Sequence, residues 1–277
     1  MFRNAVKVLL LSTAACLPFR DDGLYRCASR TDAACSEDCI CEVFATTGGE
    51  ELNAVWGSSA NDVWAAGTLG ASRQVVHWDG SGWAKATSPT TALINAVAGA
   101  SATEVWAVSY FTTDDRNVLR RSGAEWALQP AGGPTGLYTV LPFGAADVWA
   151  AGVEWGAVYH FDGARWQRVE LVNIETVRGA FGISPTDFWL AAGKGLAHGD
   201  GTAFERRHTT QSPLRAVWAS GASDVWAAGE GGQLLRGDGN TFRALKSGVT
   251  TTLTGVWGFG PGDVYVVGES GVLRFHP

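Results

Sequence analysis

One stretch of the chain decides the fold, and it reads Leu52-Asn53-Ala54-Val55-Trp56-Gly57-Ser58-Ser59-Ala60-Asn61-Asp62-Val63-Trp64-Ala65-Ala66-Gly67. Its acidic–apolar–aromatic core occurs six times along the 277 residues. The copies begin at Asp62, Glu104, Asp147, Asp187, Asp224 and Asp263, with spacings of 42, 43, 40, 37 and 39 residues. A self-similar period near 40 residues predicts a repeat architecture.

Each of the first five repeats contains four β-prone runs, which in the first copy are 52–56, 63–66, 75–78 and a run that starts at Trp83. Asp79-Gly80 separates the last two runs, and an Asp-Gly pair there predicts a hairpin because Gly accepts the positive φ of the turn. Four antiparallel strands in about 40 residues are typical of a propeller blade. We therefore predict an all-β fold, a single six-bladed β-propeller of four-stranded antiparallel blades. Its repeats start near residues 52, 94, 137, 177, 214 and 253.

The sixth repeat reaches the end of the sequence after its third strand, 272–275. In most complete repeats an aromatic residue opens the fourth strand twelve positions before the residue equivalent to Asn53, and Cys41 stands twelve positions before Asn53 itself. We predict that residues 39–45 pair beside 272–275 and close the ring, because an unpaired edge strand invites aggregation. The propeller then spans residues 39–277.

Residues 1–15 predict an export signal, with Arg3 and Lys7 before an apolar run and small residues at its end. Ser12-Thr13-Ala14-Ala15-Cys16 resembles the lipobox of bacterial lipoproteins, with Thr13 where that motif usually has Leu. Lipidation of Cys16 would leave an even set of cysteines able to form two disulfides in an oxidising compartment. That set is Cys27, Cys35, Cys39 and Cys41. The alternatives are ordinary signal-peptidase cleavage with Cys16 unmodified, and a zinc site, which the single-residue spacer between Cys39 and Cys41 disfavours.

Residues 16–38 carry many charges and few large apolar side chains, so we predict a lipid-attached, Cys-rich tether that precedes the propeller. The chain is expected to be exported and held at the outer membrane or cell surface by its lipid, or otherwise secreted. A formal net charge of −6 without a Lys/Arg run argues against nucleic acid and against electrostatic docking to anionic lipid. Contact with the membrane is expected only through the lipid, and the protein is expected to be a monomer.

The acidic residue that opens each second strand has a basic or imidazole partner on the third strand, at the same end of the blade. The pairs singled out are Asp62 with His77, Asp147 with His160, Asp187 with His198, and Asp224 with Arg236; Glu104 with Arg120 and Asp263 with Arg274 complete the pattern. An acid–base or metal site needs one constellation, whereas a register-fixing pair is wanted in every blade. We therefore predict structural pairs, with no catalytic residue, metal or cofactor.

The places where the copies differ are the candidates for function. Trp155 lies between the second and third strands of the third blade, outside the repeat positions that hold the other Trp residues. The loops at this end and the first residues of the innermost strands supply further aromatic and cationic groups. The predicted partner-binding set is Trp155, Tyr110, Phe111, Tyr138, Arg178 and Arg215. The alternative is an ordinary solvated loop face.

The pattern Val-Trp-Gly-x4-Asp-Val-Trp-Ala-x-Gly, followed by His-x-Asp-Gly-x2-Trp, resembles repeats of exported bacterial propeller lipoproteins of the BNR/kelch-like kind. The resemblance covers residues 52–276 and implies a propeller at the cell surface. The hairpin from Asp79 to Trp83 is also similar to the Asp-box of sialidases, although its spacing is shorter and the sialidase Arg triad and nucleophilic Tyr have no place here.

Three functions follow as hypotheses. The first is a non-enzymatic propeller that binds a protein or glycan partner through its loop and funnel face. The second is a glycan-active enzyme, a sialidase-like hydrolase or lyase, with an Arg-lined central site. The third is a structural scaffold in an envelope assembly. The adhesion tripeptide Arg236-Gly237-Asp238 coincides with the recurring Asp-Gly turn, which explains it without adhesion.

Overall fold

The computed structural model describes residues 51–59, 61–69, 72–86, 92–110, 117–129, 134–154, 157–171, 175–269 and 271–275. The predicted export signal, the Cys-rich tether, the closing strand 39–45, all five Cys residues, Phe111 and Trp155 lie outside these residues. Those predictions therefore stay predictions.

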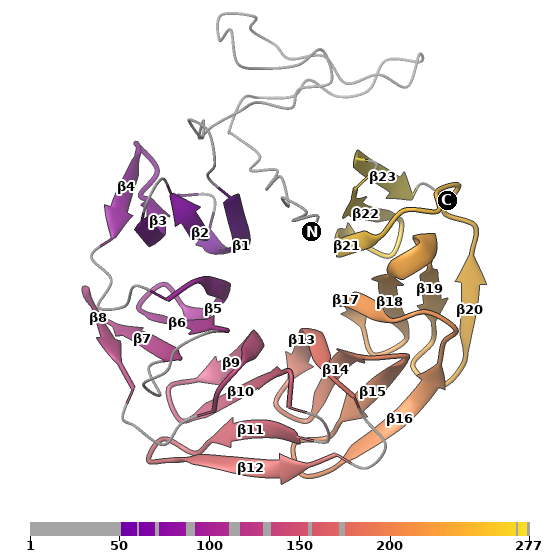
Figure 1. Cartoon of the computed structure of the whole chain (residues 1–277), viewed down its shortest axis with the longest axis horizontal. Coiled ribbons are helices and arrows are strands. Elements are labelled where there is room, and N and C mark those ends of the chain that lie inside the picture. The colour runs from indigo at the N-terminus through magenta and orange to yellow at the C-terminus, as the bar shows by residue number, and fades with distance from the viewer. Residues whose placement is uncertain are drawn as a thin grey trace, which may run out of the picture.

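Six antiparallel sheets follow one another around a common centre (Figure 1). The first three sheets are β1 (Glu51–Ser59), β2 (Asp62–Leu69), β3 (Ser72–Trp78) and β4 (Trp83–Ala86); β5 (Ile94–Ser101), β6 (Glu104–Ser109), β7 (Val118–Ser122) and β8 (Glu125–Leu128); and β9 (Leu137–Gly144), β10 (Asp147–Gly152), β11 (Ala157–Phe161) and β12 (Trp166–Glu170). The arrangement confirms the predicted all-β fold built from repeated blades.

The second half of the chain continues the pattern. Its sheets are β13 (Val177–Ser184), β14 (Asp187–Ala192), β15 (Gly195–Gly199) and β16 (Phe204–Thr209); β17 (Leu214–Gly221), β18 (Asp224–Gly229), β19 (Leu234–Gly237) and β20 (Phe242–Leu245); and β21 (Leu253–Gly260), β22 (Asp263–Gly268) and β23 (Gly271–Phe275). A single turn of 3-10 helix, η1 (Glu230–Gly232), joins β18 to β19. Among the described residues the last sheet has three strands, and the segment predicted to supply its fourth strand, residues 39–45, lies outside them.

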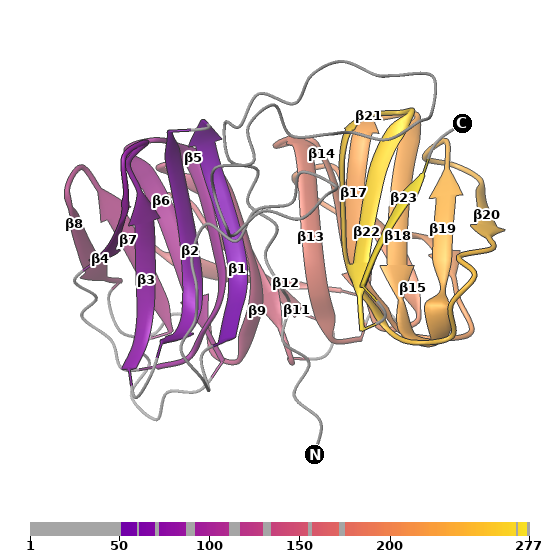
Figure 2. The same cartoon turned by 90° about the horizontal axis from the view of Figure 1, so that it is seen from above.

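The first strand of each sheet is the innermost one, and successive strands lie further out (Figure 1). The strands run from one face of the ring to the other (Figure 2). We call one of these faces the start face, because the innermost strands begin there. It is defined by the residues Asn53, Asn95, Tyr138, Arg178, Arg215 and Thr254.

The core consists of apolar clusters that fill the space between neighbouring sheets. The Trp of the repeated Asp-x-Trp phrase is its main component: Trp106, Trp189 and Trp226 are among the largest fully buried side chains. Large aromatic rings suit this place because each buries 150–250 Å² of surface or thereabouts and can bridge two sheets. The repeated phrase therefore specifies the joint between blades.

A glycine on the innermost strand completes several of these joints, since an aromatic ring of the preceding sheet lies against its backbone. An added Cβ would lie 2.3 Å from Trp56 Cη2 at Gly99, 2.3 Å from Phe143 Cζ at Gly182 and 2.6 Å from Trp218 Cη2 at Gly258. Real Cβ contacts are not this short, so a side chain at these positions would push the sheets apart.

The two ends of the chain of sheets stand apart at the top of Figure 1. Trp257 and Phe259 on β21 are 57% and 65% exposed, unlike the equivalent Trp218, which is 4% exposed. On the first sheet, the three atoms nearest to a Cβ built at Gly57 all belong to that sheet itself. The described residues of the sixth and first sheets thus do not pack on each other as the other neighbouring sheets do. We call this unmade contact the sixth joint; Trp257 lies on one side of it and Gly57 on the other.

Candidate functional site

The predicted acid–cation pairs lie within single sheets, at the end opposite the start face. His77 Nε2 is 2.6 Å from Asp62 Oδ1, His160 Nε2 2.8 Å from Asp147 Oδ1, His198 Nε2 2.9 Å from Asp187 Oδ1 and Arg236 Nε 2.6 Å from Asp224 Oδ1. Arg120 makes the same contact with Glu104, through Nε at 2.7 Å and Nη2 at 3.1 Å. The same arrangement thus recurs in the first five sheets.

Each of these cationic or imidazole groups also packs on the Trp of its own sheet. His77 stacks on Trp64 with ring centroids 4.0 Å apart, and the Arg236 guanidinium lies 4.8 Å from the centre of the Trp226 ring. The register places them side by side, since Trp64 pairs with His77 across β2 and β3. A group fixed by both an acid and an indole is part of the scaffold. Within the described residues, no group of three His, Cys, Asp or Glu side chains could hold a metal ion.

The hairpin aspartates cap their own turns. The Asp162 carboxylate accepts backbone N–H groups from Ala164 and Arg165, both at 2.9 Å. Hydrogen bonds from the turn hold the pKa of Asp79, Asp162 and Asp200 at about 2; the main donor is the Ser81 side chain for Asp79, and backbone N–H groups for the other two. Glycines in these turns have φ near 90°, for example 90° at Gly80 and 93° at Gly163, as the Asp-Gly motif predicts.

The adhesion-like tripeptide is occupied by the same structural contacts. Arg236 Nη2 donates to the Pro261 carbonyl at 3.1 Å, in addition to its bond with Asp224. Asp238 accepts N–H groups from Asn240 and Thr241 at 2.9 and 2.7 Å, which lowers the pKa of its carboxyl. Arg236 and Asp238 are thus both engaged in hydrogen bonds within the protein.

On the start face, the first two sheets use their first inner-strand residues to hold the next sheet. Asn53 Nδ2 donates to the Ile94 carbonyl at 3.2 Å, and Asn95 Nδ2 donates to the Leu137 carbonyl at 2.8 Å. The equivalent residues of the third, fourth and fifth sheets are Tyr138, Arg178 and Arg215, which cannot make that short amide bridge. These three positions therefore do not form the amide-to-carbonyl bridge that links neighbouring sheets in the first two repeats.

Tyr110, Tyr138 and Arg178 form a continuous stack across the second, third and fourth sheets, which we call the Tyr–Tyr–Arg row. The Tyr110 and Tyr138 rings are 5.1 Å apart and inclined by 17°, and the Arg178 guanidinium lies 4.9 Å from the centre of the Tyr138 ring. The hydrogen bond between the two hydroxyls, followed by the charge of Tyr138 and by burial, raises the pKa of Tyr110. All three side chains are half-buried. Three of the predicted site residues are thus brought together.

Arg215 holds the equivalent position on the next sheet around the start face, and unlike Arg178 it is paired with a described carboxylate. Its Nη2 donates to Glu230 Oε1, and the two side chains are 30% and 36% exposed. Glu230 opens η1, directly after β18, so the loop between the second and third strands delivers the acid to the inner strand. The sequence placed Glu230 at this end of the blade but did not identify it as the partner that neutralises Arg215.

A second cluster lies on the third sheet, next to Trp155 in the sequence. Tyr159 Oη donates to Glu154 Oε2, and Arg168 Nε donates to Glu154 Oε1 at 2.8 Å. Burial and then the Glu154 contact raise the pKa of Tyr159 to about 12, while the Tyr159 and Arg168 contacts lower the pKa of Glu154. Sequence reasoning missed this trio, because its members belong to two strands and a loop with no recognisable motif.

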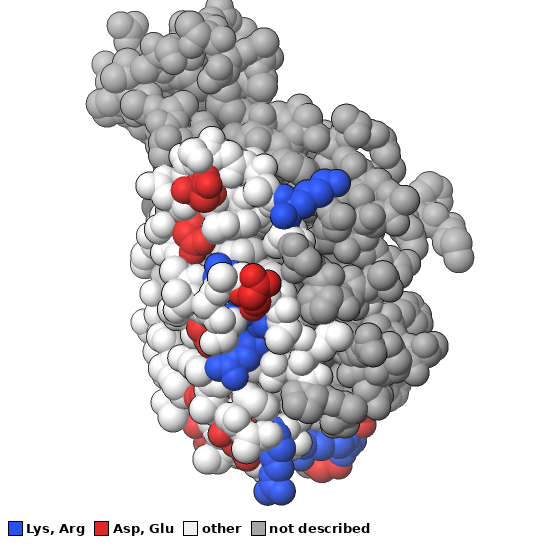
Figure 3. Space-filling view, turned by 90° about the vertical axis from the view of Figure 1, so that its left-hand side faces the viewer, with Lys and Arg blue, Asp and Glu red and all other residues white. Residues whose placement is uncertain are grey.

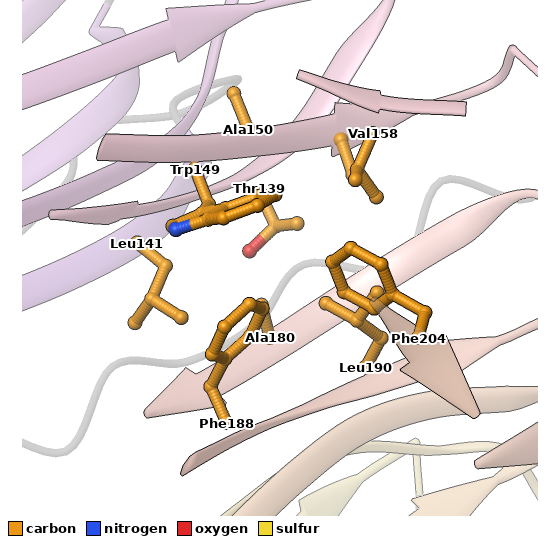
Figure 4. Close-up of a pocket in the computed structure, with 10 residues that line it drawn as sticks. Thr139, Leu141, Trp149, Ala150, Val158, Ala180, Phe188, Leu190 and Phe204 are labelled. Carbon is orange, nitrogen blue, oxygen red and sulfur yellow. The ribbon is translucent and has the colours of Figure 1, made fainter. Parts of the chain in front are cut away.

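The pocket between the described strands of the third and fourth sheets offers little room for a ligand. Figure 4 shows a small apolar void between the third and fourth sheets, lined among others by Leu141, Trp149, Phe188 and Phe204. Thr139 contributes the one side-chain oxygen drawn among its lining residues. So small a space suits at most a water molecule, and its mostly apolar lining offers too few polar groups to orient a substrate. It belongs to the core and not to a site.

On the side of the molecule seen in Figure 3, acidic and basic side chains are interspersed among uncharged ones, and the described surface there shows no continuous basic patch. None of the helical structure that the model describes has the length and apolar character needed to cross a membrane.

Comparison with known proteins gives no family: no family model matches the chain, and no curated protein does. Solved structures do match in fold. One described as "YCF48 bound to D1 peptide" has a TM-score of 0.64 at 16% identity, covering 87% of this chain and 85% of the other. A catalytically inactive virginiamycin B lyase from Staphylococcus aureus with quinupristin has a TM-score of 0.65 at 12% identity, covering 84% and 87%.

The extracellular domain of the putative one component system BT4673 from B. thetaiotaomicron has a TM-score of 0.68 at 12% identity. It covers 85% of this chain but only 33% of that one. At these identities the matches show a shared propeller fold, on which unrelated activities are found.

Proposed function

We propose that this protein is a non-enzymatic propeller, exported and tethered at the cell envelope through a lipid on Cys16, which binds a protein or glycan partner through its start face. The observation that carries the proposal is the Tyr–Tyr–Arg row. Two of its members, Tyr138 and Arg178, occupy positions that the first two sheets use to hold the next sheet, so these two side chains are released from that bridge.

The chemistry of the start face supports binding over bond cleavage. A glycosidase needs a pair of carboxyl groups or a comparable nucleophile facing a free space. Here Glu230 is engaged by Arg215 and Glu154 by Arg168 and Tyr159. The two arginines on neighbouring sheets therefore do not form one cluster of free cations, as an Arg-lined catalytic centre would require.

The comparisons support a binding propeller in general. One structural neighbour is described with a bound peptide, and another is an extracellular domain. A propeller presents a rigid face made of loops and strand ends, which suits recognition of a macromolecule. The partner, the tether and the monomeric state belong to the proposal.

The N-terminal part of the proposal has its own tests. Residues 39–45 are proposed to pair with β23 and close the ring, and the Cys-rich tether to link it to the membrane. Mass spectrometry of the mature N-terminus should find a diacylglyceryl group on Cys16. Recovery of a mature chain whose Cys16 carries no lipid would remove the anchor from the proposal.

Binding through the start face is tested by placing a photo-crosslinking amino acid at Tyr110 or Thr254 and irradiating intact cells. We expect crosslinked products from these positions, and a strong loss in the double variant Tyr138→Ala/Arg178→Ala. The control is Arg243→Ala, which removes an exposed arginine from β20 on the outer side of the ring. Crosslinks that persist in the double variant, or that arise equally from outer-strand positions, would discard the start face as the site.

A further inference from the structure

The Tyr–Tyr–Arg row has an unbalanced charge at its end. Arg215 is neutralised by Glu230, and Arg120, Arg168 and Arg236 each contact an acid. Of the described carboxylates, none lies within salt-bridge distance of Arg178. Its nearest acidic neighbour in sequence, Glu175, instead places its carboxylate against Gly193. Arg178 is half-buried, and within the described part of the chain no acceptor takes a hydrogen bond from its guanidinium.

The stack fixes the orientation of this guanidinium. The Tyr138 ring contacts both neighbours, with the Tyr110 ring centre 5.1 Å and the Arg178 guanidinium 4.9 Å from its own centre. Stacking on a phenol holds the plane of an arginine while its edge stays available, which reduces the entropy lost when it binds an anion. The two hydroxyls are hydrogen-bonded to each other. A hydroxyl that accepts such a bond keeps its own O–H as a donor, so Tyr138 can accept from Tyr110 and donate to a ligand.

We propose that Tyr110, Tyr138 and Arg178 form a subsite that binds a carboxylate of an acidic peptide segment on the partner protein. A planar fork of N–H groups beside a phenol O–H matches the geometry of a carboxylate, which accepts two parallel bonds from Arg. The inference rests on the proposed function and names the chemistry of that same face.

The extent of the row favours a peptide over an acidic sugar. The row spans three sheets at the strand ends, and the described residues form no deep pocket there, which suits an extended segment lying across the mouth of the ring. An acidic glycan is retained as an outcome of the test.

The test uses the full mature protein and fluorescence anisotropy with two labelled peptides, one in which Glu alternates with Ser and a twin with Gln in place of Glu. Binding of the Glu peptide should be at least about tenfold tighter than that of its twin, as expected for charge-assisted bonds. Arg178→Gln should abolish this preference. Arg178→Lys should restore only part of it, because Lys keeps the charge but loses the fork and the stack.

Two variants separate a subsite from general charge. Tyr138→Phe keeps the ring and removes one hydroxyl, and it should weaken the Glu peptide about threefold or more while leaving the Gln twin unchanged. Arg243→Gln removes the same charge from an outer strand and should leave both peptides within about twofold of the unmodified protein. Equal losses in Arg178→Gln and Arg243→Gln would overturn the subsite, and so would an unmodified protein that does not distinguish the peptides.

A second experiment, the selection of binding peptides from a random library, distinguishes failure of the carboxylate subsite from failure of the proposed binding function. Peptides selected from a random library on the same protein, together with a uronate oligosaccharide, are tested against the Tyr138→Ala/Arg178→Ala variant. Selected peptides that need the start face but carry no acid would refute the carboxylate subsite and leave the binding function in place. Tighter binding of the uronate oligosaccharide than of the Glu peptide would reject the peptide assignment. No ligand that depends on the start face would reject both.

Discussion

The Trp218 ring of the fifth sheet lies against the backbone of Gly258 in the sixth, with its Cη2 atom 2.6 Å from where a Cβ of residue 258 would be. Trp56 and Gly99 repeat this relationship between the first and second sheets. The joint is therefore a repeated device in which an aromatic ring from one sheet meets a bare backbone on the next.

Gly99→Ala should destabilise the fold by about 1–3 kcal/mol, because its methyl group would overlap the Trp56 ring between two packed sheets. The matched control is Gly144→Ala at the end of β9, where an added Cβ meets nothing within 4 Å. Neither glycine has a positive φ, so backbone strain does not confuse the comparison. Urea unfolding of both variants checks the prediction. Equal unfolding midpoints would contradict the packing of Trp56 on the Gly99 backbone.

Trp257 is expected to take part in a sixth joint when the ring closes. It occupies the position of Trp218 but is 57% exposed, and Gly57, which holds the position of Gly258 on the first sheet, has no aromatic ring among the three nearest described atoms. In a ring closed by residues 39–45, Trp257→Ala should cost about 3–5 kcal/mol, as Trp218→Ala should.

A chain that starts at residue 51 lacks the closing strand, and in it Trp257→Ala should cost far less than in the mature chain. Thermal unfolding of the mature chain and of the shortened chain, each with and without Trp257→Ala, measures the two losses of stability. A cost below about 1 kcal/mol for Trp257→Ala in the mature chain would show that the sixth joint does not form.

The pairing of acid, cation and Trp predicts which substitutions a blade tolerates. His77→Arg should be nearly neutral, because Arg120 occupies the same register position in the second sheet and contacts both Glu104 and Trp106. His77→Ala should cost about 1–2 kcal/mol, since it removes the Asp62 contact and the stacking on Trp64. Denaturant unfolding distinguishes the two, and an Arg variant as unstable as the Ala variant would reject the equivalence.

The hairpin aspartates predict a loss of stability in acid. The pKa values of Asp79, Asp162 and Asp200 fall from 3.8 to about 2 on folding, so the folded state binds fewer protons than the unfolded chain in this range. Their contribution is complete above the unfolded value and is lost as the pH falls from about 4 towards 2.

The triple variant Asp79→Asn/Asp162→Asn/Asp200→Asn keeps a turn acceptor without the charge. Its melting temperature should therefore depend less steeply on pH between about 4 and 2 than that of the unmodified protein. Parallel pH profiles for the two proteins would refute this origin of the acid sensitivity.

The sequence alone predicted the number of blades, because each copy of the repeat forms one sheet. It also predicted the Asp-Gly turns and the acid–cation partners, because these depend on contacts within one repeat. The spacing of Asp62 and His77 already fixes which strands must lie side by side, and alternation along a strand then brings the two side chains together. The sequence could also mark Tyr138, Arg178 and Arg215 as positions where the copies differ.

Only the tertiary structure decided what those differences do. Tyr110 and Arg178 are far apart in the chain and on different sheets, and it is the placement of three sheets around one centre that stacks both on Tyr138. The same placement gives Arg215 a carboxylate from Glu230, whereas Arg178 has none among the residues that the structure describes. Periodicity determines contacts inside a repeat, but contacts between repeats depend on how the sheets pack, and that depends on rings and glycines from two sheets at once.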